Sequence, residues 1–270
     1  MNRIDAKFKE LRERNEPAFI PFITAGDPGL EATRELIVEF DRKGSDIIEL
    51  GVPFSDPIAD GPVIQSSYYR ALSGGVKLSD IMELVKNVRK ESEIPIVSMI
   101  SQSILFKNGC DNFVRSAVKA GFDGATIPDL PVEEAEEIME AGKKEGFKII
   151  CFIAPTTTSD RMKLIVKKSQ GFLYYISVVG ITGIRSELSA DITENIQNIK
   201  RSTTLPVAMG FGISTPEQAR AAGKIADGVI VGSAIMREIE KYSNQGNKVL
   251  VDKVGRLVGE LVNSTKNQNL

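Results

Sequence analysis

The sequence predicts a TIM barrel, a (β/α)₈ fold of the α/β class in which eight parallel strands close into one sheet surrounded by helices. Short apolar segments alternate with longer segments of helical periodicity along the whole chain of 270 residues, and no linker rich in Gly, Pro or Ser interrupts them. Such alternation is typical of parallel sheets, and eight repeats fit a closed barrel better than an open sheet. We therefore expect a single domain over residues 1–270, with a polar tail at about 263–270.

The expected strands are short apolar runs bounded by turn-forming residues. Side chains alternate along a strand, so Ile47 and Glu49 should share one face of the second strand, while Ile48 and Leu50 share the other. In a barrel, one of these faces points into the lumen. The eight expected strands cover residues 18–24, 46–51, 95–100, 124–128, 148–154, 171–178, 206–209 and 228–231.

The expected helices follow from caps and from apolar residues three and four positions apart. Asp27 and Pro28 should be the N-cap and first residue of the helix after the first strand, which should end near Gly44. Thr215 and Pro216 should likewise open a short helix. The other helices are expected around Leu84 and Val88, Phe113, Val114 and Ala117, Val132 to Met139, residues 160–168, Ile192, Ile196 and Ile199, and Leu250, Val254, Leu257 and Leu261.

The overall charge and hydropathy exclude several kinds of partner. The net charge is −2, and no segment is dominated by Lys or Arg. We therefore expect neither nucleic-acid binding nor attachment to an anionic membrane surface. The chain has no signal-peptide pattern and no apolar stretch of about 18 residues, which predicts a cytoplasmic protein without a membrane span.

The absence of histidine restricts the chemistry further. It excludes a Ser-His-Asp hydrolase, a metal site with His ligands and a His general base. Acid–base chemistry near neutral pH then falls to carboxylates, Tyr, Cys or Lys. Cys110, on an expected helix, and Cys151, in an expected strand, are interpreted as small buried apolar side chains rather than a disulfide framework.

Two acidic residues at the end of the second strand are candidates for catalysis, because active sites of these barrels lie at the carboxyl ends of the strands. Glu49 stands among apolar residues, and burial in the lumen would raise its pKa and favour proton transfer; the alternative is a structural ion pair. Asp60 could supply a second carboxylate or could simply form an Asp-Gly turn. The loop between them also holds Pro53, Pro57 and Pro62, and a stiffened loop of this length is often functional.

Glycines after the last three strands predict a phosphate site. Backbone N–H groups of such loops, together with a helix N-terminus, bind phosphate without Lys or Arg, and the loops after strands 7 and 8 are its usual place in these barrels. The alternative is that the glycines only make tight turns. The residues are Gly180 and Gly183, Gly210 and Gly212, and Gly232, which is followed by Ser233 at the start of a helix.

These features predict an enzyme that acts on a small phosphorylated molecule with carboxylates, without a metal ion or histidine. A Schiff-base aldolase would require a lysine inside the barrel. Lys148 is the only lysine that we place in a strand, and it lies at the beginning of that strand, away from the expected site.

Several segments resemble the tryptophan synthase α chain family. Residues 21–28 (PFITAGDP) and 49–62 (ELGVPFSDPIADGP) are similar to two family signatures, and the second is highly specific. Similar blocks follow in the family's order at residues 154–157, 174–183, 210–214 and 232–235, so that the resemblance runs from about residue 5 to 262. It implies a lyase of tryptophan biosynthesis that splits indole-3-glycerol phosphate into indole and glyceraldehyde 3-phosphate.

The resemblance implies roles for the matching residues. Glu49 would be the principal acid–base residue, which helps to protonate indole C3 and takes the proton of the hydroxyl that becomes the aldehyde. Asp60 would bind the indole N–H and stabilise the positive charge that develops on the ring, and Tyr174 would assist in the site. The substrate-binding residues would be Phe22 in the indole pocket, Thr182 on a loop that closes over the substrate and faces Asp56, Gly183, Gly212, Gly232 and Ser233 around the phosphate, and Gly210.

The resemblance also implies a partner. The α chain would dock on a tryptophan synthase β subunit that carries pyridoxal phosphate (PLP), in an α2β2 heterotetramer. Pro53, Asp56 and Pro57 lie in the loop that would communicate with this partner. The α chain itself would need no cofactor, because the PLP would belong to the β subunit.

One segment departs from the family pattern. After the third strand the family usually has a Tyr and an Asn near the site, whereas this chain has Ser101 and Ser103. This difference leaves two alternatives open. The chain could be a retro-aldol lyase for another phosphorylated substrate, or a weakly active α chain that acts mainly as an allosteric activator of the β subunit.

Overall fold

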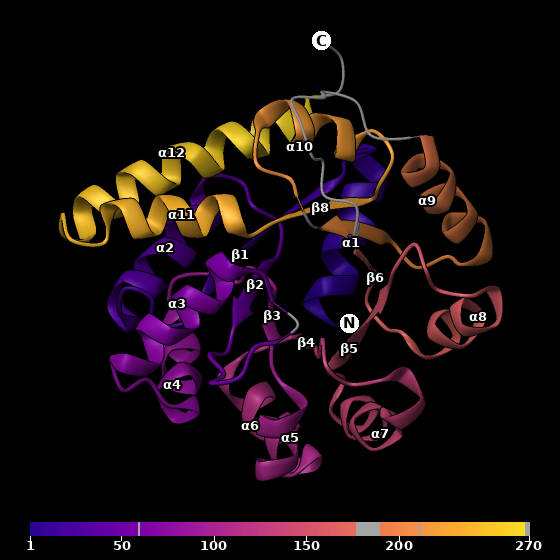
Figure 1. Cartoon of the computed structure of the whole chain (residues 1–270), viewed down its shortest axis with the longest axis horizontal. Helices are drawn as coiled ribbons and strands as arrows, with labels where there is room; N and C mark the ends of the chain where they lie inside the picture. The colour runs from indigo at the N-terminus through magenta and orange to yellow at the C-terminus, as the bar shows by residue number, and fades with distance from the viewer. Residues whose placement is uncertain (59, 177–189, 211, 268–270) are drawn as a thin grey trace.

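The computed structural model describes residues 1–58, 60–176, 190–210 and 212–267, and within them eight parallel strands form a closed barrel (Figure 1). Each strand pairs with the next one in the sequence, and the last pairs with the first. This topology confirms the predicted single-domain TIM barrel. The strands are β1 (Ala18–Thr24), β2 (Ile48–Gly51), β3 (Ile96–Met99), β4 (Gly124–Thr126), β5 (Lys148–Ile153), β6 (Leu173–Ile176), β7 (Val207–Gly210) and β8 (Gly228–Val231).

The strands agree closely with the sequence analysis. β1 and β8 have the predicted bounds, whereas most of the others are shorter. β4 ends two residues before Pro128, which has no N–H to donate to a neighbouring strand. For β6, the predicted residues 177 and 178 lie outside the described residues.

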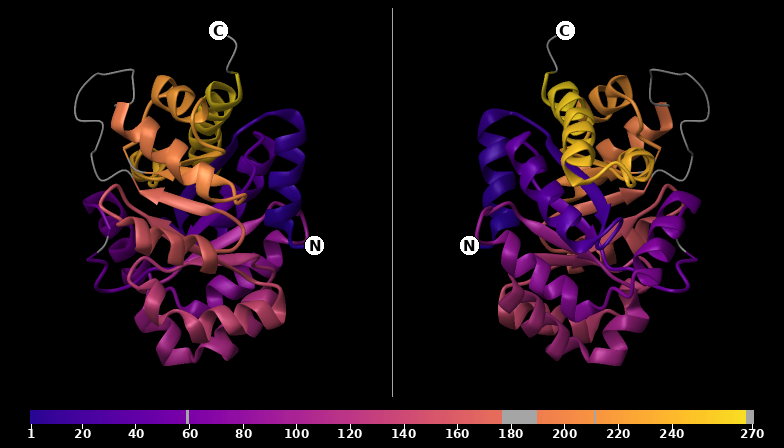
Figure 2. Two further views of the ribbon diagram at one scale, coloured as in Figure 1. Left: turned by 90° about the vertical axis from the view of Figure 1, so that its right-hand side faces the viewer. Right: turned by 90° about the vertical axis from the view of Figure 1, so that its left-hand side faces the viewer.

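The barrel is enclosed by a ring of helices (Figures 1 and 2). In the side views of Figure 2 the N-terminus lies on the side away from the viewer of Figure 1. No helix of the described ranges is long and apolar enough to cross a membrane. The helices are α1 (Arg3–Arg14), α2 (Leu30–Arg42), α3 (Pro62–Ser73), α4 (Leu78–Val88), α5 (Gln102–Asn108), α6 (Cys110–Ala120), η1 (Val132–Glu134, a 3₁₀-helix), α7 (Glu136–Glu145), α8 (Ser159–Lys168), α9 (Ala190–Ser202), α10 (Pro216–Gly223), α11 (Ser233–Tyr242) and α12 (Asn247–Lys266).

Two apolar layers form the core. The larger layer lies between the strands and the helices and contains Ile48 and Leu50, whereas Ile47 belongs to the lumen. The predicted alternation along β2 is therefore confirmed, and it places Glu49 on the lumen side. Cys110 and Cys151 are both buried and free, as expected.

The start of α2 differs from the prediction. The helix begins at Leu30, and Gly29 is its N-cap. The expectation that Asp27 would cap the helix and Pro28 would open it is therefore wrong. Asp27 is buried, and its two carboxylate oxygens accept hydrogen bonds of 3.0 and 2.7 Å from the Arg70 guanidinium. This bidentate pair occupies the carboxylate, so Asp27 fixes α3 against the loop after β1 instead of capping α2.

Several helices were not predicted or have other bounds. Three helices, α1, α3 and α5, do not follow from the sequence pattern described above. The helix expected from Val132 begins as the separate 3₁₀-turn η1, and α7 follows it. The start of α10 after Thr215 is confirmed, with a capping box between Thr215 and Gln218. α12 continues to Lys266, so residues 263–266 of the expected polar tail are helical.

α1 closes the amino-terminal end of the barrel. Its residues Ile4, Phe8 and Leu11 are buried in the apolar cluster of the lumen. At the same end, the ammonium group of Lys148 pairs with Asp5 at 2.7 Å. Lys148 is thus bound to α1 at the beginning of β5, which agrees with its exclusion as a Schiff-base residue.

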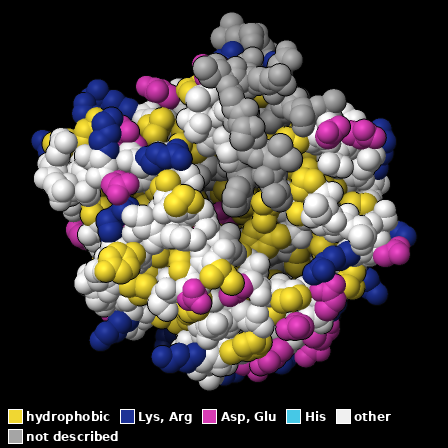
Figure 3. Space-filling model, in the orientation of Figure 1, with side chains coloured by type: hydrophobic (Ala, Val, Ile, Leu, Met, Phe, Trp, Pro, Cys, Tyr) yellow, Lys and Arg dark blue, Asp and Glu magenta, His cyan; other side chains and the backbone are white. Residues whose placement is uncertain are grey.

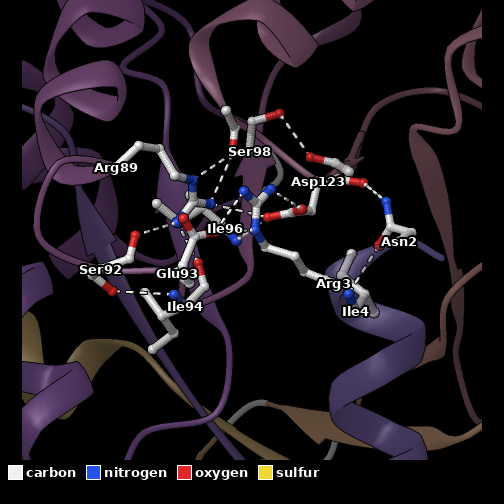
Figure 4. Close-up of polar contacts among 12 residues, drawn as sticks. Asn2, Arg3, Ile4, Arg89, Ser92, Glu93, Ile94, Ile96, Ser98 and Asp123 are labelled. Atoms are coloured by element: carbon white, nitrogen blue, oxygen red, sulfur yellow. Dashed lines mark hydrogen bonds and ion pairs between the residues drawn. The ribbon is translucent and has the colours of Figure 1, made fainter.

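A buried carboxylate joins α1 to the strands (Figure 4). Asp123, which precedes β4, accepts hydrogen bonds from Arg3 at 3.1 Å, from Arg89 at 3.0 Å and from the backbone N–H of Ile96 at 2.9 Å. The side chain of Asp123 is only 4% exposed. Because three donors from α1, the end of α4 and β3 meet at one carboxylate, this network fixes the amino-terminal end of the barrel.

Candidate active site

A cavity of about 220 Å³ opens at the carboxyl ends of the strands. Figure 3 looks onto this face, where hydrophobic side chains gather around the middle and most Lys, Arg, Asp and Glu side chains lie at the periphery. The cavity contains most of the predicted site residues that the structure describes. Its lining residues are Phe22, Glu49, Asp60, Gly61, Ile64, Met99, Tyr174, Gly212, Ile213, Ser214, Ile230, Gly232, Ser233, Ala234 and Arg237.

Glu49 lies in the wall of this cavity and is only 2% exposed. Its Oε1 accepts a hydrogen bond from Thr126 Oγ1 at 3.0 Å, and the hydroxyl of Tyr174 lies 3.5 Å from Oε2. Burial raises the pKa of Glu49 to about 7; the charge of Asp60 also raises it, whereas the hydrogen bond from Thr126 lowers it. No Lys or Arg of the described residues pairs with Glu49, so none of them forms the structural ion pair that was the alternative. A carboxyl group with a pKa near neutrality can both donate and accept a proton.

Asp60 supplies the second carboxyl group of the cavity. Its backbone N–H donates to the carbonyl of Pro57, and the Gln65 side chain donates to its carbonyl, so Asp60 is held in a turn before α3. The turn of the second alternative is therefore present, and it brings the side chain of Asp60 to the cavity. Burial raises the pKa of Asp60 to about 6, and the negative charge of Asp129 raises it as well.

Tyr174, on β6, is buried in the lumen beside Glu49. Burial raises its pKa well above the ordinary value, and the charge of Glu49 acts in the same direction, so the side chain stays a neutral phenol. The ring packs against Phe152 with 4.8 Å between centroids. A Cβ on Gly210 would lie 2.7 Å from the Tyr174 ring and hydroxyl, so Gly210 leaves room for this side chain; Gly210 does not line the cavity.

Glycines and a helix N-terminus form the other end of the cavity. Gly212 has a φ of 77°, which favours glycine. Gly232 is the N-cap of α11 and Ser233 is its first residue, so free N–H groups of the helix lie at the cavity wall. The predicted substrate residues Thr182 and Gly183, and Gly180, lie outside the described residues.

Arg237 also lines this end of the cavity, on the second turn of α11. Among the described residues it is the only cationic one in the lining, and no ion pair ties it to another of them. The phosphate site expected from the sequence had no Lys or Arg, so Arg237 was not among the expected site residues. A signal was present, because Arg237 follows Ser233 by four positions and thus lies one helical turn beyond it.

Apolar side chains line the space between the carboxylates and the helix. Phe22 is buried and lines the cavity together with Ile64, Met99 and Ile230. A Cβ on Gly51 would lie 2.6 Å from the Phe22 ring. Gly51 lies two positions after Glu49 in β2, and the lack of a side chain there leaves room for the ring. This apolar wall suits an aromatic ligand.

Of the two unusual serines after β3, Ser101 has a defined side-chain partner. Ser101 Oγ donates to Asp129 Oδ2 at 2.7 Å, and the backbone N–H of Gln102 donates to Asp129 Oδ1 at 2.8 Å. Ser101 is also the N-cap of α5, whereas Ser103 is exposed. Asp129 is thus a third acidic residue at this face, which the sequence analysis did not single out, and it acts electrostatically on Asp60.

The loop after β2 carries the predicted partner residues. Pro53 is buried and Asp56 is exposed, and Asp56 and Pro57 line a small cavity of about 30 Å³ with Asp60 and others. Ile58, in the same loop, is 83% exposed, and Phe106 on α5 is 56% exposed. These two segments follow the adjacent strands β2 and β3, so their exposed apolar side chains are candidates for a contact with a partner.

A larger cavity of about 390 Å³ lies next to the site, beneath η1 and α8. Its charged lining residues are Asp129 and Arg161, and Arg161 pairs with Glu133 at 3.1 Å. It contains neither Glu49 nor Asp60 nor a helix N-terminus with glycines. The smaller cavity is therefore the candidate active site, because only there do acid–base groups and an anion site meet.

The chemistry of the site follows from its two ends. At one end, two carboxyl groups with pKa values of about 7 and 6 can exchange protons and stabilise a cation at neutral pH. At the other end, the N-terminus of α11 and Arg237 suit an anion such as phosphate. The described residues contain no cluster of acidic or Cys side chains arranged to bind a metal ion.

Comparison with known proteins agrees with this geometry. Residues 8–266 match the family model described as tryptophan synthase alpha chain. The tryptophan synthase alpha chain of Clostridium kluyveri is 45% identical over 264 residues, which cover 98% of this chain and 99% of the relative. The crystal structure of tryptophan synthase subunit alpha from Legionella pneumophila has a TM-score of 0.90 at 36% identity and covers 98% of both chains. A chain from the tryptophan synthase a2b2 complex of Pyrococcus furiosus has a TM-score of 0.82 at 39% identity, covering 90% of this chain and 98% of that one.

Proposed function

The chain belongs to the tryptophan synthase alpha chain family, and on this premise we propose that Glu49 and Asp60 are its catalytic carboxyl groups. The family reaction is the cleavage of indole-3-glycerol phosphate to indole and glyceraldehyde 3-phosphate in tryptophan biosynthesis, and this chain is a lyase of that type. The observation that carries the assignment of residues is that both carboxyl groups line one cavity with the N-terminus of α11.

Glu49 would transfer both protons. In its neutral form it donates a proton to indole C3, which makes that carbon tetrahedral and leaves a positive charge on the ring nitrogen. The resulting carboxylate then takes the proton of the hydroxyl on the adjacent side-chain carbon. As the aldehyde forms, the bond between that carbon and C3 breaks and its electron pair restores the indole ring. Glu49 ends protonated, as it began, so the cycle balances.

Asp60 and Tyr174 would support this transfer. The carboxylate of Asp60 would accept the indole N–H and stabilise the positive charge that develops on the ring. The Tyr174 hydroxyl, 3.5 Å from Glu49 Oε2, would help to hold the acid–base group at the substrate. Phe22 would contact the indole ring, and Gly212, Gly232, Ser233 and the helix N-terminus would bind the phosphate. On the family resemblance alone, we propose that Gly183 also binds the phosphate and that Thr182 contributes to substrate binding; both lie outside the described residues.

A partner subunit fits the exposed apolar residues at the barrel mouth. The relative from Pyrococcus furiosus is part of an a2b2 complex that shows mutual activation. We propose that this chain assembles in the same way with a tryptophan synthase β subunit in the cytoplasm, through the loop with Pro53, Asp56 and Pro57. Ile58 and Phe106 would then be covered. The PLP of the complex would belong to the β subunit.

The test is indole release from indole-3-glycerol phosphate by the full chain, with and without a β subunit from the same source. We expect indole formation that the β subunit stimulates. E49Q should lose indole formation by a factor of about 10³ or more, because its amide can neither donate nor accept the required proton. E83Q, a change at an exposed Glu on α4, is the matched control. Indole formation by E49Q at the wild-type rate would refute the proposed mechanism.

Two alternatives are separated by the same proteins. If the chain acts mainly as an activator, E49Q should still stimulate the β subunit as well as the wild type does, while both make little indole. Ser101 stands where the family usually has an aromatic residue, and its hydroxyl donates a hydrogen bond to Asp129. This difference is the reason for testing a second substrate. A panel of phosphorylated aldol-type substrates would reveal such a specificity.

A further inference from the structure

We propose that Thr126 positions the carboxyl group of Glu49 and determines which of its two oxygens carries the transferred proton. The inference rests on the proposed function, because it concerns the acid–base role of Glu49. Thr126 is the last residue of β4, and its side chain is completely buried. Its hydroxyl donates a hydrogen bond to Glu49 Oε1 at 3.0 Å.

The two oxygens of Glu49 have different surroundings. Oε1 accepts the hydrogen of the Thr126 hydroxyl at 3.0 Å, whereas the contact of Oε2 among the described residues is the longer one of 3.5 Å with the Tyr174 hydroxyl. An oxygen that already accepts a hydrogen bond at this distance is the less favourable place for a second hydrogen. The proton of neutral Glu49 therefore belongs on Oε2, on the side of Tyr174.

Thr126 acts from behind the cavity. Glu49 and Tyr174 line the cavity, whereas Thr126 is absent from its lining. The hydroxyl therefore contacts Glu49 without reaching the space for substrate. This arrangement makes Thr126 a positioning residue, which acts on the reaction only through the carboxyl group that it holds.

The sheet holds the hydroxyl in place. Thr126 pairs with Met99 on β3 and with Ile150 on β5, and β3 in turn pairs with β2, which carries Glu49. A β-branched side chain on a strand has few rotamers, so the position of the hydroxyl follows from the backbone. Val in this place would keep the shape and remove the donor, and Ser would keep the donor.

The experiment compares T126V and T126S in the full chain with its β subunit bound. For T126V we expect kcat to fall roughly tenfold with KM within about twofold, since a hydrogen bond to a charged group is lost while the substrate contacts remain. The hydrogen bond favours the carboxylate, so its loss raises the pKa of Glu49. The limb of the kcat/KM profile that depends on Glu49 should then move to higher pH by about 0.5 to 1. T126S should have the wild-type kcat and the wild-type position of this limb.

A direct titration separates this effect from general damage. The ¹³C signal of the Glu49 carboxyl, assigned by its absence in E49Q, should titrate at higher pH in T126V than in the wild type and T126S. T265V is the matched control, because Thr265 is equally buried but donates to a backbone carbonyl within α12. It should leave the titration of Glu49 unchanged.

Two results would overturn the inference. One is a T126V protein with the wild-type kcat and the wild-type titration of Glu49. The other is an equal loss of kcat in T126V and T126S with an unshifted titration, which would indicate a packing role. Wild-type activity in E49Q would instead refute the proposed function. In that case the titration of Glu49 in T126V would still show whether the Thr126 hydroxyl lowers the pKa of Glu49.

Discussion

At the scale of single residues, the two carboxyl groups of the cavity should give the reaction a bell-shaped pH dependence. Asp60, with a pKa of about 6, must be ionised to stabilise the ring cation, and Glu49, with a pKa of about 7, must be protonated to begin the transfer. Activity should therefore fall as the pH drops through the pKa of Asp60 and as it rises through that of Glu49. The kcat/KM profile measures these free-enzyme groups.

A change at Asp129 tests whether Asp60 controls the acidic limb of the kcat/KM profile. Its negative charge raises the pKa of Asp60, so D129N should lower that pKa and move the acidic limb to lower pH. The substrate phosphate titrates in the same way with the wild type and with D129N, so it does not contribute to the difference between their profiles. An unshifted acidic limb in D129N would show that Asp60 does not control it.

Arg237 should contribute to binding of the substrate rather than to the chemical step. R237Q removes the cation that the described residues supply to the cavity lining. KM should therefore rise roughly fivefold, as expected for the loss of one partly solvated charge contact, with kcat within about twofold. The effect should shrink at high salt. K241Q, on the next turn of α11, is the control. A wild-type KM for R237Q at low salt would exclude this role.

The sequence reveals those residues that are unusual where they stand. Glu49 stands out because a carboxylate is rare among the apolar residues of a buried strand. The glycines stand out because they recur at the ends of three successive strands. Thr is common in β-strands, so Thr126 gives no sign of a functional role in the sequence. Its importance arises only from a partner 77 positions away.

At the scale of elements, the network around Asp123 should stabilise the closed end of the barrel. D123A leaves Arg89, whose side chain is 11% exposed, without its carboxylate, and frees the backbone N–H of Ile96. Removal of one partner from such a buried pair costs about 3–5 kcal/mol of unfolding free energy. Urea denaturation measures this loss, with D160A as control because Asp160 is 96% exposed. Equal stability of the two variants would contradict the role of the network.

The elements differ in how well the sequence predicts them. Strands such as β1 and β8 are apolar and short, and their bounds follow from the pattern. The start of α2 was misplaced because the local cap signal of Asp27 was overridden by Arg70, which lies 43 positions away. α1 was overlooked although Ile4, Phe8 and Leu11 have helical spacing, since no strand precedes it in the repeating pattern.

At the scale of the whole molecule, closure of the barrel assembles the site. Glu49 is brought to Thr126 and Tyr174, which lie 77 and 125 positions further along the chain, by the order of β2, β4 and β6 in one sheet. The eight-strand alternation predicts that these strand ends meet at one face. It does not predict which side chains touch, because that depends on the register of each strand pair.

The same face should bind the partner subunit, and Ile58 tests this expectation. Ile58 is 83% exposed, so I58D should leave the stability of the isolated chain unchanged. A charge buried at an apolar interface without a partner should weaken binding of the β subunit by roughly tenfold or more. Calorimetric titration with the β subunit measures the Kd, and thermal unfolding checks the fold. Y69D is the matched control, because Tyr69 is 74% exposed on the outer helix α3. If both variants bind the β subunit with the wild-type Kd, the loop after β2 is not part of the interface.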